Sequence, residues 1–123
     1  MNKRILAIDD EAELLDAVAA WLESNGYEVK TAKNGLEGLG IAGLFKPHLI
    51  ILDISMPKMD GFEVLTHLRQ MQEMKEVPIV MLSGQGRTEN IMEAERLKAV
   101  DFLLKPCRGE ELLETVERHI GKP

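Results

Sequence analysis

The chain has little cysteine, few aromatic residues and no long apolar run, and each shortage excludes a class of protein. One thiol, Cys107, is too few for an internal disulfide or for a zinc or iron-sulfur site built on cysteines. Aromatic residues make up only 4% of the chain, which suits a helix-covered sheet better than an aromatic recognition surface. The apolar runs are far shorter than the roughly 20 residues that span a bilayer, and no export signal is visible. We therefore expect a cytoplasmic protein that does not enter the membrane.

Positive charge is also in the minority. Lysine and arginine number 15 against 21 aspartates and glutamates, which gives a net charge of -6. Such a chain repels a polyanion, so the composition predicts no direct nucleic-acid binding by this domain. The acidic balance instead suits a cation, or a partner that presents a basic surface.

Short apolar runs alternate with segments of helical spacing along the whole chain. The runs predict five strands, at residues 5–8, 27–32, 48–52, 77–82 and 100–104. Apolar residues spaced three or four apart, as in Leu14, Val18 and Leu22, predict a helix after each strand. The alternation predicts an α/β fold of the (βα)5 kind, a parallel sheet with helices on both faces. We expect one domain over 1–120, with 121–123 as a tail or the start of a linker.

Acidic side chains lie at the ends of two predicted strands. Asp9 and Asp10 follow the first strand, and Asp53 closes the third. In an open sheet of strand order 2-1-3-4-5, ligands bind beyond the carboxyl ends of the first and third strands, where the order reverses. Carboxylates gathered there repel one another, and their burial is costly unless a cation compensates for them. The grouping favours a magnesium ion, which takes oxygen ligands and commonly uses one or two carboxylates with water and phosphate oxygens.

Two further polar residues follow the remaining strands. Ser83 comes after the apolar run 80–82, and Lys105 comes after 102–104. With the acids they supply an oxygen nucleophile, a metal site, a hydroxyl donor and a cation. This set can place a phosphoryl group. The residues alone therefore predict phosphoryl chemistry at this edge of the sheet.

The same motifs resemble the receiver domain of bacterial response regulators, the chemotaxis-regulator-like part of two-component systems. The resemblance covers essentially the whole chain and is carried by four segments: Asp9-Asp10-Glu11, residues 52–61 (LDISMPKMDG), Ser83, and residues 102–106 (FLLKP). It implies a flavodoxin-like receiver fold with strand order 2-1-3-4-5.

The resemblance also implies a role for each site residue. It makes Asp53 the phosphoacceptor and Ser83 and Lys105 its phosphoryl-binding partners, and it makes the Lys105-Pro106 bond cis. It makes Ser83 and Phe102 the residues that switch. It assigns Mg²⁺, for which Mn²⁺ can substitute, to the following groups: Asp10, Asp53, the backbone carbonyl of Ser55, and Asp9 in an assisting role.

The implied function is signalling, not turnover of a substrate. A sensor histidine kinase or phosphotransfer protein would donate the phosphoryl group, and the resulting change in the face of helix 4, strand 5 and helix 5 would be read by an effector domain or protein. The only chemistry expected of the domain itself is its own phosphorylation and dephosphorylation. Dimerisation through the same face is left open.

Three other functions fit parts of the pattern. A magnesium phosphohydrolase with an aspartyl-phosphate intermediate would resemble an Asp-x-Asp pattern, but Ser55 stands where the second aspartate is needed as acid and base. A nucleotide or flavin binder would need a glycine-rich loop after the first strand, which is missing. A receiver-like interaction module that is never phosphorylated is disfavoured by the intact acid, hydroxyl and lysine set.

Taken singly, the same residues have ordinary structural explanations. Strand-end aspartates often form turns or cap helices, and Phe102 alone would be a core residue. The three histidines show no spacing that would gather them around a metal. The functional interpretation therefore depends on the combination and not on any one position.

Overall fold

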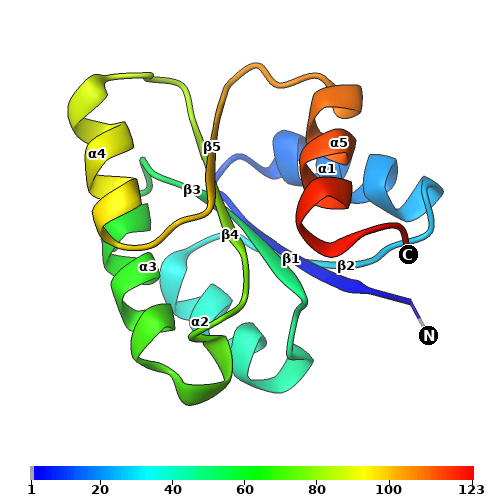
Figure 1. The fold of residues 1–123 in the computed structure, drawn as a ribbon, viewed down its shortest axis with the longest axis horizontal. Helices are drawn as coiled ribbons and strands as arrows, with labels where there is room; N and C mark the ends of the chain where they lie inside the picture. Colours follow the sequence, from blue (N-terminus) through cyan, green and yellow to red (C-terminus); the bar gives the residue numbers. More distant parts are fainter. Residues whose placement is uncertain (1) are drawn as a thin grey trace.

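A single parallel sheet covered by helices on both faces makes up the computed structural model, which describes residues 2–123 (Figure 1). Met1, the first residue of the expected domain, lies outside the described residues. The strands are β1 (Arg4–Ile8), β2 (Glu28–Ala32), β3 (Leu49–Asp53), β4 (Ile79–Ser83) and β5 (Asp101–Leu104). The α-helices are α1 (Ala12–Ser24), α2 (Gly35–Phe45), α3 (Gly61–Gln70), α4 (Thr88–Arg96) and α5 (Gly109–Ile120).

The strand order is β2-β1-β3-β4-β5, and every neighbouring pair is parallel. This confirms the predicted (βα)5 fold and its strand order. The strand limits differ from the prediction by one or two residues, and a short 3-10 helix at Gln72–Met74 was not predicted. No helix in the described part of the chain has the length and apolar character needed to cross a bilayer.

Local sequence signals account for several helix limits. Asn34 caps α2, because its side chain accepts a hydrogen bond from the Glu37 backbone N–H at 2.9 Å. Asp60 and Glu63 form a capping box at the start of α3. Gly26 follows the end of α1 with a φ of 97°, a conformation that glycine adopts without steric cost.

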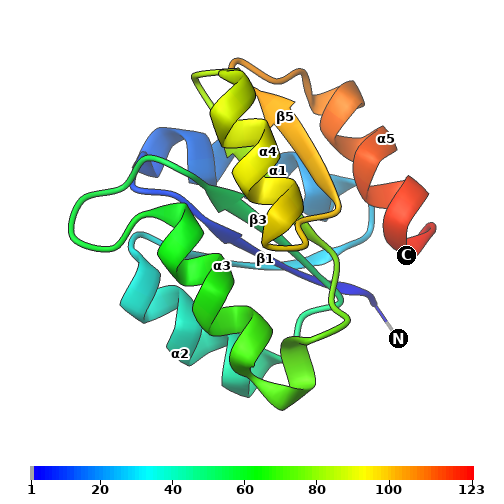
Figure 2. The ribbon, with the colours of Figure 1, turned by 60° about the vertical axis from the view of Figure 1, so that its left-hand side comes forward.

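The apolar core lies in two layers, one on each face of the sheet. One layer joins the sheet to α2, α3 and α4, and the other joins it to α1 and α5 (Figure 2). The central strands β3 and β4 are buried along their whole length. Because their backbones are fixed on both faces, the residues at their carboxyl ends have well-defined positions.

Candidate functional site

The site lies at the carboxyl edge of the sheet. Asp9 directly follows β1, Asp53 ends β3, Ser83 ends β4, and Lys105 directly follows β5. The structure therefore brings residues from four strands to one edge, at the junction of β1 and β3 where the strand order reverses.

Three carboxylates form the centre of the site. Asp9, Asp10 and Asp53 each offer an oxygen within 4.8 Å of the others. Asp9 and Asp53 are each only 3% exposed, whereas Asp10 lies at the surface. One Asp9 oxygen, Oδ1, accepts a hydrogen bond from the Glu11 backbone N–H at 3.0 Å. The other, Oδ2, is buried and forms an ion pair with Lys105, whose Nζ lies 2.9 Å away.

This arrangement fits a hard divalent cation. All three groups are carboxylates, the ligand type that Mg²⁺ takes from proteins, and their oxygens lie within 4.8 Å of one another. A cation at this position would also reduce the repulsion among the three negative charges. The donor set therefore agrees with the magnesium site expected from the sequence.

The surroundings of Asp53 raise the pKa of its carboxyl group. Burial raises its pKa from 3.8 to about 6, and the charge of Asp9 adds to the increase. The Lys105 ammonium and the Ser55 backbone act in the opposite direction without outweighing burial. Without a metal, the ionised Asp53 carboxylate therefore destabilises the folded state relative to the unfolded chain.

Lys105 connects the carboxylates of the site. Its Nζ lies 2.9 Å from Asp9 Oδ2, 2.9 Å from Glu11 Oε1 and 3.3 Å from Asp53 Oδ1. Burial by itself would lower the pKa of Lys105, but the three carboxylates outweigh it and raise the pKa above its usual value. The lysine therefore remains a cation next to Asp53. The bond between Lys105 and Pro106 is cis, as the resemblance implied.

Ser83 lies near the acids, but its hydroxyl group is engaged elsewhere. The Oγ accepts a hydrogen bond from the Gln85 backbone N–H at 3.0 Å and donates to the Gln85 carbonyl at 3.2 Å. Its own carbonyl accepts from the Lys105 backbone N–H at 2.7 Å, which ties the ends of β4 and β5 together. The serine hydroxyl therefore belongs to the turn before α4 in this structure and makes no hydrogen bond to Asp53.

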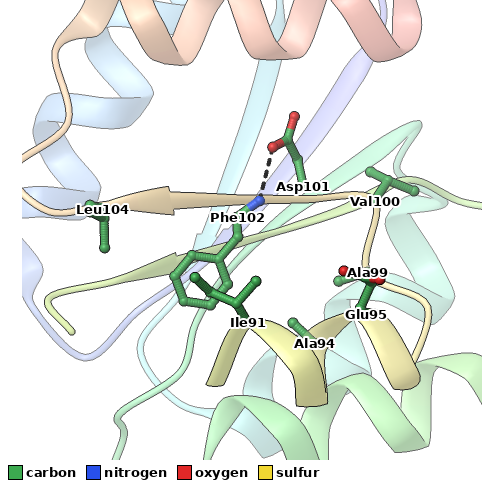
Figure 3. Close-up of a pocket in the computed structure, with 8 residues that line it drawn as sticks. All are labelled: Ile91, Ala94, Glu95, Ala99, Val100, Asp101, Phe102 and Leu104. Atoms are coloured by element: carbon green, nitrogen blue, oxygen red, sulfur yellow. Dashed lines mark hydrogen bonds between the residues drawn. The ribbon is translucent and has the colours of Figure 1, made fainter. Parts of the chain in front are cut away.

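Phe102 lies between β5 and α4 at the side of the sheet. Its ring is half-buried beside Ile91 and lines a pocket of about 390 Å³ that α4 and β5 form together (Figure 3). The Phe102 backbone N–H donates to Asp101 Oδ1 at 2.9 Å. The aromatic ring thus has open space next to it.

Two residues matter to this site in ways that the sequence did not reveal. In the sequence Glu11 is only the acid after the aspartate pair, yet it accepts a hydrogen bond from Lys105. A Cβ atom on Gly61 would lie 2.2 Å from the Asp53 carbonyl oxygen, so only glycine allows α3 to begin this close to the site. Neither the Glu11–Lys105 contact nor the close approach of Gly61 to Asp53 can be found in a single sequence, because both depend on distances between separate segments.

The fold and the site together define a doubly wound α/β domain. Its ligand site is lined by carboxylates and lies where the strand order reverses. The response regulator receiver domain is the family whose model matches this chain, over residues 5–117, and the chain belongs to that family. It acts as a receiver domain in two-component signal transduction.

Individual relatives support the same assignment. The chain is 38% identical to the DNA-binding dual master transcriptional regulator RpaA of Synechocystis sp., over 92% of this chain and 47% of that protein. It is 40% identical to the alkaline phosphatase synthesis regulator PhoP of Bacillus subtilis, over 91% of this chain and 46% of that protein. The chain therefore spans about half the length of these curated relatives.

A solved structure of similar size matches closely. The chemotaxis protein CheY4 of Vibrio cholerae is 35% identical, with a TM-score of 0.94, and the match covers 97% of this chain and 99% of that one. The receiver domain of NtrX from Brucella abortus is 34% identical with a TM-score of 0.87, over 94% and 97% of the two chains.

Proposed function

We propose that Asp53 is the residue that accepts the phosphoryl group. The observation that carries this assignment is the position of the Asp53 carboxylate, buried beside two other aspartates and 3.3 Å from the Lys105 ammonium. An Asp53 oxygen would attack the phosphorus atom and form a new P–O bond. The bond from phosphorus to the donor breaks, and its electron pair leaves with the donor group, an imidazole nitrogen or a carboxylate oxygen. The product is an aspartyl phosphate.

The other site residues would bind the metal and balance charge. Mg²⁺, or Mn²⁺ in its place, would be held by Asp10, Asp53 and the backbone carbonyl of Ser55, with Asp9 assisting. When bound, the metal supplies positive charge that offsets the carboxylates and the incoming phosphoryl oxygens. Lys105 would balance charge beside Asp53, since its ammonium lies 3.3 Å from the Asp53 carboxylate and is protonated.

Ser83 and Phe102 would convert phosphorylation into a change of surface. For its hydroxyl to donate to a phosphoryl oxygen, Ser83 must give up the hydrogen bond that it donates to the Gln85 carbonyl, which would loosen the turn before α4. The Phe102 ring can then turn inward and alter the α4, β5 and α5 face. Phosphorylation shifts this equilibrium only to the extent that the phosphoryl group prefers the altered arrangement.

The partners follow from the same proposal. The donor would be a phosphohistidine on a sensor histidine kinase or phosphotransfer protein, and the output an effector domain or protein. The last helix ends at Ile120, which supports residues 1–120 as one domain, with 121–123 as a tail or the start of a linker. Dimerisation through α4, β5 and α5 stays a prediction.

Intact-mass measurement tests the phosphoacceptor directly. The protein is incubated with MgCl₂ and acetyl phosphate, beside Asp53→Asn and a sample with excess EDTA. We expect one added phosphoryl group on the wild type with magnesium, and none on Asp53→Asn. Equal labelling of the variant, or no labelling of the wild type with acetyl phosphate or phosphoramidate, would refute the assignment. Sustained hydrolysis of a phosphate monoester would favour the phosphohydrolase instead.

A further inference from the structure

Lys105 is directed toward Glu11 and not toward Asp53. Three carboxylates lie near its ammonium, but the hydrogen bond that it donates within the described residues goes to Glu11 Oε1, at 2.9 Å. Asp9 Oδ2 forms an equally short ion pair with Nζ at 2.9 Å, and Asp53 Oδ1 is farther away at 3.3 Å. The resting lysine is therefore engaged by a residue to which the sequence assigned no role.

The local structure of Glu11 also differs from what its position favours. Glu11 is the N-cap of α1, where a side chain usually accepts a hydrogen bond from the first turn of the helix. Its carboxylate makes no such bond and reaches Lys105 instead. The backbone N–H of Glu11 is held by Asp9 Oδ1, which fixes the base of the side chain beside the site.

The three carboxylates differ in how easily they can release the lysine. Asp9 and Asp53 are buried, whereas the Glu11 side chain is 62% exposed and that of Lys105 is 16% exposed. A carboxylate that returns to water loses little when an ion pair breaks, but a buried one would be left without its partner. Glu11 is therefore the partner that Lys105 can exchange most readily.

We infer that Glu11 is a positioning residue that holds Lys105 in the unphosphorylated domain and is displaced from it when a phosphoryl group reaches Asp53. The inference rests on the proposed function of Asp53. A phosphoryl oxygen accepts a stronger, charge-assisted hydrogen bond than the exposed carboxylate does, so Lys105 turns from Glu11 to the new group. Because the Glu11 contact must break first, Glu11 slows the acceptance of the phosphoryl group.

The expected effect is modest because the pair is partly exposed. Breaking such an ion pair in advance should raise the initial rate of phosphorylation by about two- to fivefold at subsaturating acetyl phosphate. The variant is Glu11→Gln, which keeps the shape of the side chain and removes its charge. Maximum rate and half-saturating donor concentration are measured separately, with magnesium constant.

Two control variants separate the contact from a general effect of charge. Glu13→Gln makes the same charge change two residues farther along, at an exposed position of α1. Glu13 has no ion pair among the described residues. Glu11→Asp keeps the charge, but aspartate is too short to reach Lys105 as well and is a strong N-cap, so its carboxylate should turn to the helix. We expect Glu11→Asp to behave like Glu11→Gln, and Glu13→Gln to behave like the wild type.

A spectroscopic readout follows Lys105 itself. In unphosphorylated protein labelled with ¹³C and ¹⁵N lysine, the Lys105 Cε and Nζ signals are assigned by their loss in Lys105→Arg. Both Glu11 variants should shift these signals, and Glu13→Gln should not. Unchanged Lys105 signals in both Glu11 variants would overturn the inference.

The outcomes for Asp53 and for Glu11 can be told apart. If wild type takes up no phosphoryl group, the proposed function fails and the displacement of Glu11 fails with it. If wild type is phosphorylated but Glu11→Gln is no faster, or Glu13→Gln is accelerated as much, the function of Asp53 stands and only the inference is refuted.

Discussion

Replacing Asp53 by asparagine should stabilise the metal-free domain at neutral pH. In the fold its pKa is about 6, against 3.8 for an unperturbed aspartate. Because the folded state binds this proton more tightly than the unfolded chain does, stability is lost as pH rises from below 4 to above 6. At about 1.4 kcal/mol per pKa unit, the ionised carboxylate costs about 3 kcal/mol at pH 7.5 and about 1 kcal/mol at pH 4.5.

Asparagine has nearly the same shape and carries no charge, so Asp53→Asn should recover most of that free energy. Lys105 loses one partner but keeps Asp9 and Glu11, and the raised pKa of Asp53 already includes the attraction to Lys105. We expect the variant to be up to about 3 kcal/mol more stable than wild type at pH 7.5, and about 1 kcal/mol more stable at pH 4.5.

The assay is urea denaturation in excess EDTA, followed by circular dichroism at both pH values. Asp16→Asn is the matched control, because Asp16 is an exposed acid of α1 outside the carboxylate cluster, and its change should stay within about 0.5 kcal/mol. Magnesium should then stabilise wild type more than Asp53→Asn, since binding to the folded state raises stability by mass action. A destabilised variant at pH 7.5, or a gain independent of pH, would refute the reasoning.

Two backbone positions give further predictions, both measured as free energies of unfolding in urea. Gly61→Ala should destabilise by about 3 kcal/mol, because the new Cβ would meet the Asp53 carbonyl oxygen; Gly40→Ala on α2, where nothing lies within 4 Å, should not destabilise. Lys98→Gly should stabilise by about 1 kcal/mol, because Lys98 has a φ of 69° that glycine adopts more easily. Lys98→Ala removes the same charge but keeps a Cβ, so an equal gain from it would contradict the backbone explanation.

Much of the site could be predicted because it depends on strand ends. Asp53 and Lys105 are 52 positions apart in the sequence, yet each is placed by the strand that precedes it. Since all five strands are parallel, their carboxyl ends meet at one edge, and the acids, the hydroxyl and the lysine are brought there together. Ser83 shows what strand position cannot predict. Strand position placed the residue correctly, but the direction of its hydroxyl is set by Gln85.

The sequence by itself determined the alternation of strands and helices and the group of residues that follow the strands. These follow from local periodicity and from the geometry that parallel sheets share, whereas the strand order was implied by the resemblance of the motifs to the receiver family. Only the tertiary structure decided that Asp53 has a raised pKa, that Lys105 is bonded to Glu11, and that Gly61 leaves no room for a side chain. Burial, charge separation and close approach depend on distances of a few ångströms between segments far apart in the chain, and no local pattern of residues fixes such distances.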